Sequence, residues 1–493
     1  AEAEDKARRL RKAMEEAPDY ETWRSAAEAL DEIQGWTEWR SKAASAYYDS
    51  GFIAHRLAEM SKLERAGDVA GMVSWLRAGM MRNLGGMGNS NLDDRALTGT
   101  KLLIEEHQRG MARLLTRVAN CPEEEMSLED RLTFFAEARH VLGKTALLLS
   151  GGAILGMVHI GVVRTLKKHG LLPRVISGSS AGSIVAGVVG TRTSEELDAL
   201  LESPEAVIGT LRLSFFDQKP FLAKAYQLLS TGYLMDYRHL AKTLQADIGD
   251  YTFAEAHRRT GVVLNIPVVP GGALDKPKIL NYLTAPHVLV WSAVVASCAC
   301  PYLFEATALV AKGKDGKHEP FMFSHIKWVD GSISSDLPMQ PLQELFNADY
   351  FVACQTNPHI LPFVQFAQRS LTRPWRRAKV STLRTSLTNL FFAAASELLY
   401  LCKQVSRLGQ AAGLGFVPNM MAAIVHQTFV ADCTLVQPVQ VDLYLRLFCD
   451  PDLDMMRRFF TIAERLVWPN LAAIKRHSEV QRVLDQCVGL LAK

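Results

Sequence analysis

The stretch Thr145-Ala-Leu-Leu-Leu149 runs directly into Ser150-Gly151-Gly152-Ala153-Ile154-Leu155-Gly156, and this junction decides the fold that we expect. A short apolar run that stops at two glycines predicts a buried strand that meets a turn. Residues 157–169 then show helical spacing, residues 174–177 form a second strand-like run, and residues 184–189 look helical again. Strand, glycine turn and helix, repeated twice, are typical of a parallel sheet. We therefore predict an α/β fold with a mostly parallel central sheet.

Two regions of different character flank this α/β pattern. Residues 1–140 combine mixed charge with helical periodicity, and the sequence beyond residue 360 is again helical in character. We expect three units: a helical N-terminal domain over residues 1–140, an α/β catalytic domain over 141–360, and a helical C-terminal region over 361–493. Further strands are predicted at residues 262–269, 279–283 and 350–355.

The composition limits the function without identifying it. The 493 residues are 48% hydrophobic, which allows a large core, and the net charge of +3 is too small to indicate a nucleic-acid or membrane partner. The eight scattered cysteines fit buried thiols in a reducing cytosol. No uninterrupted apolar run reaches the roughly 18–20 residues of a membrane-spanning helix. The chain begins without a methionine, as a processed or truncated product would.

The second strand-like run leads into a candidate nucleophile. Gly178-Ser179-Ser180-Ala181-Gly182 matches G-x-S-x-G, in which small neighbours let a serine stand on a sharp turn between strand and helix. The amides at the start of the following helix would face developing negative charge. A glycine-rich packing turn is the alternative for the pentapeptide alone, and its position after a strand-like run favours the nucleophile.

The first glycine turn is a candidate anion cradle. The amides of Gly151, Gly152 and Ala153 can approach an oxyanion without side-chain obstruction. The competing interpretation is a dinucleotide-binding turn, because Gly151 to Gly156 loosely imitates G-x-G-x-x-G. That interpretation requires a carboxylate at the end of the next strand, where the sequence has the serine motif instead.

A serine nucleophile needs a base. Trp328-Val-Asp330-Gly331-Ser332 brings a carboxylate out of an apolar pair into a glycine turn, so Asp330 is the candidate. The alternative is that Asp330 and Gly331 form an ordinary surface turn without a catalytic role. A Ser-His-Asp triad would need a downstream histidine, and none of the three nominal candidates lies in a recognisable loop after a strand: His359, His426 and His477.

Taken together and in this order, the three motifs resemble the patatin-like phospholipase family. Five further segments resemble the intracellular triacylglycerol lipase branch of this family: residues 82–89, 98–101, 280–286, 296–299 and 336–338. The resemblance implies a patatin-like three-layer sandwich and a Ser/Asp dyad. Ser180 would form the acyl-enzyme, Asp330 would be the general base, and the amides of Gly151, Gly152 and Ala153 would hold the oxyanion. It implies no metal and no organic cofactor.

Two positions depart from the common family pattern. Leu155 stands where an Arg or Lys often precedes the last glycine of the oxyanion loop, which weakens a phospholipid-specific interpretation. Ser332 stands in the turn after Asp330 and Gly331, where Gly or Ala is frequent. The resemblance therefore implies a triacylglycerol lipase that releases diacylglycerol and fatty acid in lipid-droplet catabolism.

Other functions remain alternatives. A (lyso)phospholipase or a lysophospholipid acyltransferase could use the same dyad, and a catalytically silent lipid-droplet scaffold could keep the fold without the chemistry. His325 and Asp330 match H-x4-D, a pattern found in glycerolipid acyltransferases. Two residues at this spacing often arise by chance.

The expected partner is a neutral-lipid and phospholipid surface, with no nucleic acid. Arginines between Arg369 and Arg384 surround Trp375 and precede the apolar residues 387–402, which places basic charge beside apolar area. A solvated basic loop before a core helix is the alternative. We expect a cytoplasmic protein that lies peripherally on lipid droplets or the endoplasmic reticulum membrane.

Overall fold

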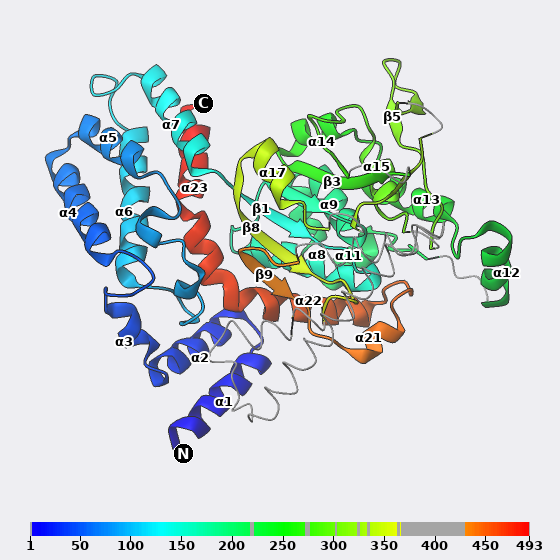
Figure 1. The fold of residues 1–493 in the computed structure, drawn as a ribbon, viewed down its shortest axis with the longest axis horizontal. Helices are drawn as coiled ribbons and strands as arrows, with labels where there is room; N and C mark the ends of the chain where they lie inside the picture. The colour runs from blue at the N-terminus through cyan, green and yellow to red at the C-terminus, as the bar shows by residue number, and fades with distance from the viewer. Residues whose placement is uncertain are drawn as a thin grey trace, which may run out of the picture.

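The computed structural model describes residues 2–216, 221–271, 277–300, 303–322, 326–332, 336–361, 365 and 429–492. A sheet with helices on its faces forms one side of the molecule, and a layer of helices forms the other side (Figure 1). His325, His426, the arginines from Arg369 to Arg384 and residues 387–402 lie outside the described residues.

The central sheet is mostly parallel, as predicted. Its parallel strands lie in the order β3-β2-β1-β8-β9, and two short strands, β4 and β7, pair antiparallel with β3. The strands are β1 (Lys144–Leu149), β2 (Val175–Gly178), β3 (Val263–Pro270), β4 (Lys278–Leu280), β7 (Trp328–Asp330), β8 (Ala348–Gln355) and β9 (Cys433–Val436), with a separate hairpin of β5 (Val310–Lys312) and β6 (His318–Pro320). The strand β9 lies in the region expected to be helical, and the sequence analysis missed it.

Both faces of β1 are buried, which explains its unbroken apolar run. Leu147 and Leu149 belong to a core that includes residues of α8, α9 and α22. Ala146 and Leu148 belong to a second cluster that includes residues of α17, as the alternation of side chains along a strand requires. The expected three-layer arrangement is therefore present. The helices of this part are α8 (Val158–Lys168), α9 (Ala181–Thr191), α10 (Ser194–Leu200), α11 (Pro204–Thr210), α12 (Phe221–Thr231), α13 (Tyr237–Ile248), α14 (Phe253–Thr260), α15 (Val290–Ser297), α17 (Met339–Phe346), α21 (Val441–Leu445) and α22 (Leu453–Val467).

The helical layer is built from both ends of the chain. Its N-terminal helices are α1 (Glu2–Glu16), α2 (Tyr20–Ile33), α3 (Trp36–Ser41), α4 (Ser50–Ala66), α5 (Val69–Gly79), α6 (Leu102–Ala119) and α7 (Leu128–Leu142). The long helix α23 (Leu471–Leu491) packs against α6 and α7 (Figure 1). Val480, Leu484 and Cys487 of α23 lie in the same apolar cluster as residues of α5, α6 and α7. Residues near the C-terminus thus complete the core of the N-terminal helices.

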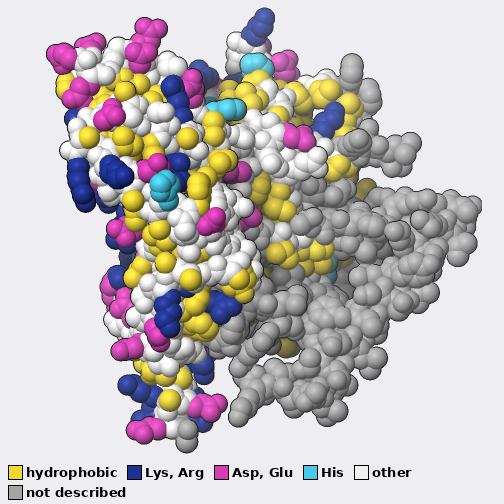
Figure 2. All heavy atoms as spheres, turned by 60° about the vertical axis from the view of Figure 1, so that its left-hand side comes forward, with side chains coloured by type: hydrophobic (Ala, Val, Ile, Leu, Met, Phe, Trp, Pro, Cys, Tyr) yellow, Lys and Arg dark blue, Asp and Glu magenta, His cyan; other side chains and the backbone are white. Residues whose placement is uncertain are grey.

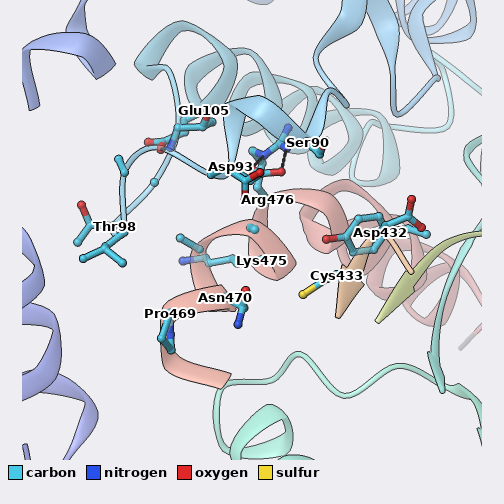
Figure 3. A pocket seen from close by; sticks show the side chains of 18 of the residues that line it. Ser90, Asp93, Thr98, Glu105, Asp432, Cys433, Pro469, Asn470, Lys475 and Arg476 are labelled. Carbon is cyan, nitrogen blue, oxygen red and sulfur yellow. Dashed lines mark hydrogen bonds and ion pairs between the residues drawn. The ribbon is translucent and has the colours of Figure 1, made fainter. Parts of the chain in front are cut away.

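A charged network joins this layer to the sheet. Arg476 of α23 forms an ion pair with Asp93 (Figure 3). The Asp93 carboxylate also contacts His477. The His477 ring stacks on Tyr350 of β8 with 4.2 Å between ring centroids. Arg82 pairs with Asp349 and donates to backbone carbonyls at the start of β1. His477 therefore belongs to a structural junction, not to a triad with Ser180.

A polar pocket of about 400 Å³ lies at this junction, lined by residues of the 90–100 loop, α6, β9 and α23 (Figure 3). Figure 2 shows Lys and Arg side chains interspersed with Asp and Glu over the face that the N-terminal helices form. In the part of the chain that the structure describes, no helix is both long and apolar enough to cross a bilayer.

Candidate active site

Ser180 occupies a strained turn between β2 and α9. Its backbone has φ 50° and ψ −123°, which non-glycine residues rarely adopt and which is typical of a nucleophile elbow. A Cβ atom on Gly178 would lie 2.3 Å from the Gly182 carbonyl oxygen, and one on Gly182 would lie 2.1 Å from the Leu149 carbonyl oxygen. Both glycines of G-x-S-x-G are therefore required by packing.

Neighbouring side chains hold this turn in place. The Ser180 N–H donates to Ser297 Oγ at 3.1 Å, and Ser297 Oγ donates to the Pro267 carbonyl at 3.0 Å. Ser297 comes from one of the secondary motifs of the sequence analysis, residues 296–299. The Ser179 N–H donates to the Leu149 carbonyl at 3.0 Å, so the elbow is also tied to the end of β1.

Asp330 lies at the end of β7, where β7 pairs with β3, and is 2% exposed. Burial raises the pKa of its carboxyl to about 6, and hydrogen bonds from Ser332 and from the Ser180 side chain act in the opposite direction. A Cβ on Gly331 would lie 2.4 Å from the Pro267 carbonyl oxygen, so the turn requires glycine. The carboxylate thus lies within hydrogen-bonding reach of the serine that is 150 positions away.

The loop after β1 brings the backbone of Gly152 and Ala153 close to Ser180 and Asp330. Gly152, with φ 156°, directly precedes the short helix η3 (Ala153–Met157), and Ala153, with φ 49°, is the first residue of that helix. The first N–H groups of a helix have no acceptor within the helix, so they can face a ligand. A Cβ on Gly152 would lie 2.5 Å from Thr356 Oγ1, which explains the glycine.

The amide of Gly151, one of the three predicted oxyanion donors, already has a partner in the structure. Its N–H donates to Oδ1 of Asp336 at 3.0 Å and is therefore not available to an oxyanion in this arrangement. The two remaining amide donors are those of Gly152 and Ala153. The sequence analysis did not identify Asp336 as part of the site. The signal that could have found it is a second carboxylate six positions after Asp330 and two before a proline.

One cavity of about 480 Å³ joins these groups. It is lined by Gly151, Gly152, Ala153, Ser180, Ala181, Asp330 and Ser332. Its other walls are mainly apolar and come from Met157, Ile184, Phe215, Phe216, Leu234, Leu240, Leu303, Phe304, Leu447 and Phe448. A nucleophile, a carboxylate and amide donors at the wall of an apolar cavity can carry out acyl transfer on a hydrophobic ester.

Two histidines lie near this cavity without a described bond to Ser180 or Asp330. His359 lines the cavity. His159 is buried beneath the oxyanion loop, with Nε2 2.9 Å from the Ser150 carbonyl oxygen, and burial lowers its pKa to about 4. A neutral His159 supports the loop from below. Among the described residues, no three or more His, Cys, Asp or Glu side chains are grouped so that they could hold a metal ion.

Comparison with known families and proteins agrees with this geometry. A family model described as patatin-like phospholipase matches residues 147–342, and one described as a domain of unknown function (DUF3336) matches residues 1–140. The α/β part and the N-terminal helices are therefore both found in other proteins.

The relatives match along nearly the whole chain. The chain is 36% identical to triacylglycerol lipase SDP1L of Arabidopsis thaliana, with 98% of this chain and 58% of that protein covered. It is 33% identical to triacylglycerol lipase 4 of Saccharomyces cerevisiae, with 96% of this chain and 52% of the relative covered. It is 32% identical to triacylglycerol lipase ptl3 of Schizosaccharomyces pombe, and 97% of each is covered. The chain thus spans little more than half the length of the first two relatives.

Proposed function

This chain belongs to the patatin-like phospholipase family, and from that membership we propose that it is a carboxylic ester hydrolase that acts on triacylglycerol. The observation that carries the proposal is the meeting of Ser180 and Asp330 in one apolar cavity. The names of the relatives supply the substrate class, and the cavity walls are suited to an acyl chain.

The proposed reaction uses only these groups. Ser180 Oγ attacks the ester carbonyl carbon while its proton passes to Asp330. The amides of Gly152 and Ala153 donate to the tetrahedral oxyanion. Asp330 then gives the proton to the departing glycerol oxygen, and diacylglycerol leaves an acyl-enzyme on Ser180. Water attacks the acyl-enzyme with Asp330 as base, and fatty acid departs as the Ser180 hydroxyl is restored.

The proposal includes peripheral contact with a lipid surface, on lipid droplets or the endoplasmic reticulum membrane. The helix α21 exposes Val441 and Leu445, which are 72% and 84% accessible and lie on one helix face. Leu447 and Phe448 of the same segment line the cavity, and the Leu447 carbonyl accepts the Ile154 N–H of the oxyanion loop at 3.2 Å. An apolar surface beside the cavity suits a substrate that arrives from a lipid phase.

The test is fatty-acid release from emulsified triolein and from phosphatidylcholine. Wild type, Ser180→Ala and Asp330→Asn are compared, with Ser194→Ala as control because Ser194 is exposed outside the cavity. We expect release from triolein to be lost in the first two variants and kept in the control. Preference for phosphatidylcholine would favour the phospholipase alternative. If a fluorophosphonate did not label Ser180 of the folded wild type, the hydrolase proposal would be wrong.

A further inference from the structure

A second buried carboxylate lies next to the proposed dyad. Asp336 is 2% exposed and lies six residues after Asp330, before α17. Asp336 takes no part in the proposed reaction. Burying a carboxylate is costly unless its oxygens accept hydrogen bonds, so its contacts indicate what it does.

The contacts of Asp336 reach three loops that follow three parallel strands. After β1, the Gly151 N–H donates to Oδ1 at 3.0 Å. After β8, the Asn357 side-chain amide donates to Oδ2 at 2.7 Å. After β2, the Ser179 hydroxyl donates to the Asp336 backbone carbonyl at 2.9 Å. Since the carboxyl ends of parallel strands meet at one edge of a sheet, one residue joins the oxyanion loop, the elbow and the end of β8.

The hydrogen bond from Gly151 to Asp336 helps to orient the loop that carries the proposed oxyanion donors. Gly151 precedes Gly152 and Ala153, the two amides that remain for an oxyanion. With its N–H held by Asp336, the Ser150–Gly151 peptide plane is fixed in orientation, directly before the peptide that carries the Gly152 N–H. Donors must lie about 2.7–3.1 Å from the developing charge to stabilise it, so a rotation of this loop would weaken them.

The two carboxylates are electrostatically coupled, and Asp330 has the lower pKa of the two. Neither carboxylate forms an ion pair with a described Lys, Arg or His. Burial raises the pKa of Asp336 to about 7, its amide donors oppose the shift, and the nearby charge of Asp330 adds to it. In the part of the chain that the structure describes, the other titratable groups around the two carboxylates are thiols and imidazoles: Cys298, Cys300, His159 and His359.

We propose that Asp336 is a positioning residue that orients the oxyanion loop against the elbow. This inference rests on the proposed hydrolase function and names a further residue for it. A purely structural anchor would affect stability and leave the kcat of the folded protein unchanged.

Two substitutions separate these roles. Asp336→Asn keeps an oxygen for the Gly151 N–H and removes the charge, and Asn357 can turn its amide oxygen toward the new NH₂ group. Asp336→Ala removes the acceptor as well. Asp31→Asn is the matched control, because Asp31 is 1% exposed and accepts the N–H groups of Leu97 and Thr98, away from the cavity.

The experiment measures kcat and KM on a water-soluble p-nitrophenyl ester from pH 5 to 9, together with the rate of Ser180 labelling by a fluorophosphonate. For Asp336→Asn we expect near-wild-type kcat, because the new side chain still offers an oxygen to the Gly151 N–H. We also expect an unshifted acid limb, because Asp336, with its higher pKa, is already neutral where Asp330 takes up a proton. For Asp336→Ala we expect kcat to fall about 10-fold or more with little change in KM. The acid limb of Asp31→Asn should coincide with that of wild type.

Two results would overturn the inference: a folded Asp336→Ala protein with unchanged kcat, or an Asp336→Asn protein that loses as much kcat as Asp336→Ala. Circular dichroism and thermal unfolding of each variant report whether it is folded, and Asp336→Ser replaces the alanine variant if that protein does not fold. If wild-type Ser180 neither labels nor turns over ester, the hydrolase proposal fails and this inference fails with it. If wild-type Ser180 is labelled and folded Asp336→Ala keeps its kcat, only the inference on Asp336 fails.

Discussion

Oδ1 of Asp330 accepts the backbone N–H of Ser332 at 2.8 Å, two residues further along the chain. An aspartate that bonds its own backbone in this way fixes its side-chain orientation through the turn it makes. One carboxylate oxygen is therefore held by local structure, and the group as a whole is presented to the Ser180 side chain. A glycine bend and a strained elbow position the pair, and among the described residues no imidazole is bonded to either side chain.

The first prediction concerns pH. Since burial raises the pKa of Asp330 to about 6, the base is protonated below that pH and ionised above it. We expect kcat/KM on a soluble ester to rise about tenfold per pH unit below pH 6 and to level off above it. A profile measured from pH 4.5 to 8.5 checks this. A rate independent of pH across that range would contradict a carboxylate base.

The second prediction concerns the elbow. In Gly182→Ala the new methyl group would meet the Leu149 carbonyl oxygen, so we expect a stability loss of about 1–3 kcal/mol or more and loss of Ser180 labelling. Gly209→Ala is the control, because Gly209 lies in α11 with open space around it. Alanine there should stabilise by about 0.5–1 kcal/mol. Equal melting temperatures for the two variants would argue against the packing account.

The third prediction concerns the helical layer. Leu484 of α23 is fully buried among residues of α5, α6 and α7, so Leu484→Ala should cost about 2–5 kcal/mol. Hydrogen exchange should rise in α6 and α7, hundreds of residues away in sequence. Leu490→Ala is the control, since that side chain is 51% exposed. If hydrogen exchange rose only in α23, the N-terminal helices would be stable without the packing of α23.

The fourth prediction concerns the lipid surface. Replacing Val441 and Leu445 by serine should lower sedimentation with phospholipid-coated triolein droplets by several-fold, while turnover of a soluble ester stays at the wild-type level, because neither side chain lines the cavity. Val141→Ser is the control, since Val141 is 58% exposed on α7 of the helical layer. If droplet binding persisted in the double variant, the contact would lie elsewhere.

Much of the fold could be predicted because its signals are local. The apolar run of residues 145–149, the glycines after it and the pentapeptide around Ser180 each combine a strand with a turn. The strand β9 has only four residues and is separated from β8 by more than 70, so no local pattern marks its pairing. The packing of α23 against α6 and α7 is likewise a long-range contact that periodicity does not reveal.

The candidate site was predictable to the same extent. Ser180 and the glycine loop each follow a parallel strand, and the carboxyl ends of parallel strands meet at one edge of a sheet. Asp330 ends β7, which pairs antiparallel with β3, so that rule did not predict its place. The partner of the Gly151 amide was not predictable, because a glycine in a motif does not reveal where its N–H points. Asp336 resembled an ordinary residue before a proline until its contacts were known.

The position of α23 has a consequence for the newly made protein. The helices encoded first cannot finish burying their apolar faces until residues 471–491 have left the ribosome, some 330 positions after α7 ends. At typical synthesis rates of about 5–20 residues per second, this delay is roughly 15–70 seconds. During that interval the earliest helices expose a surface that must be kept from other chains, so this layer is where we expect chaperone dependence to be greatest.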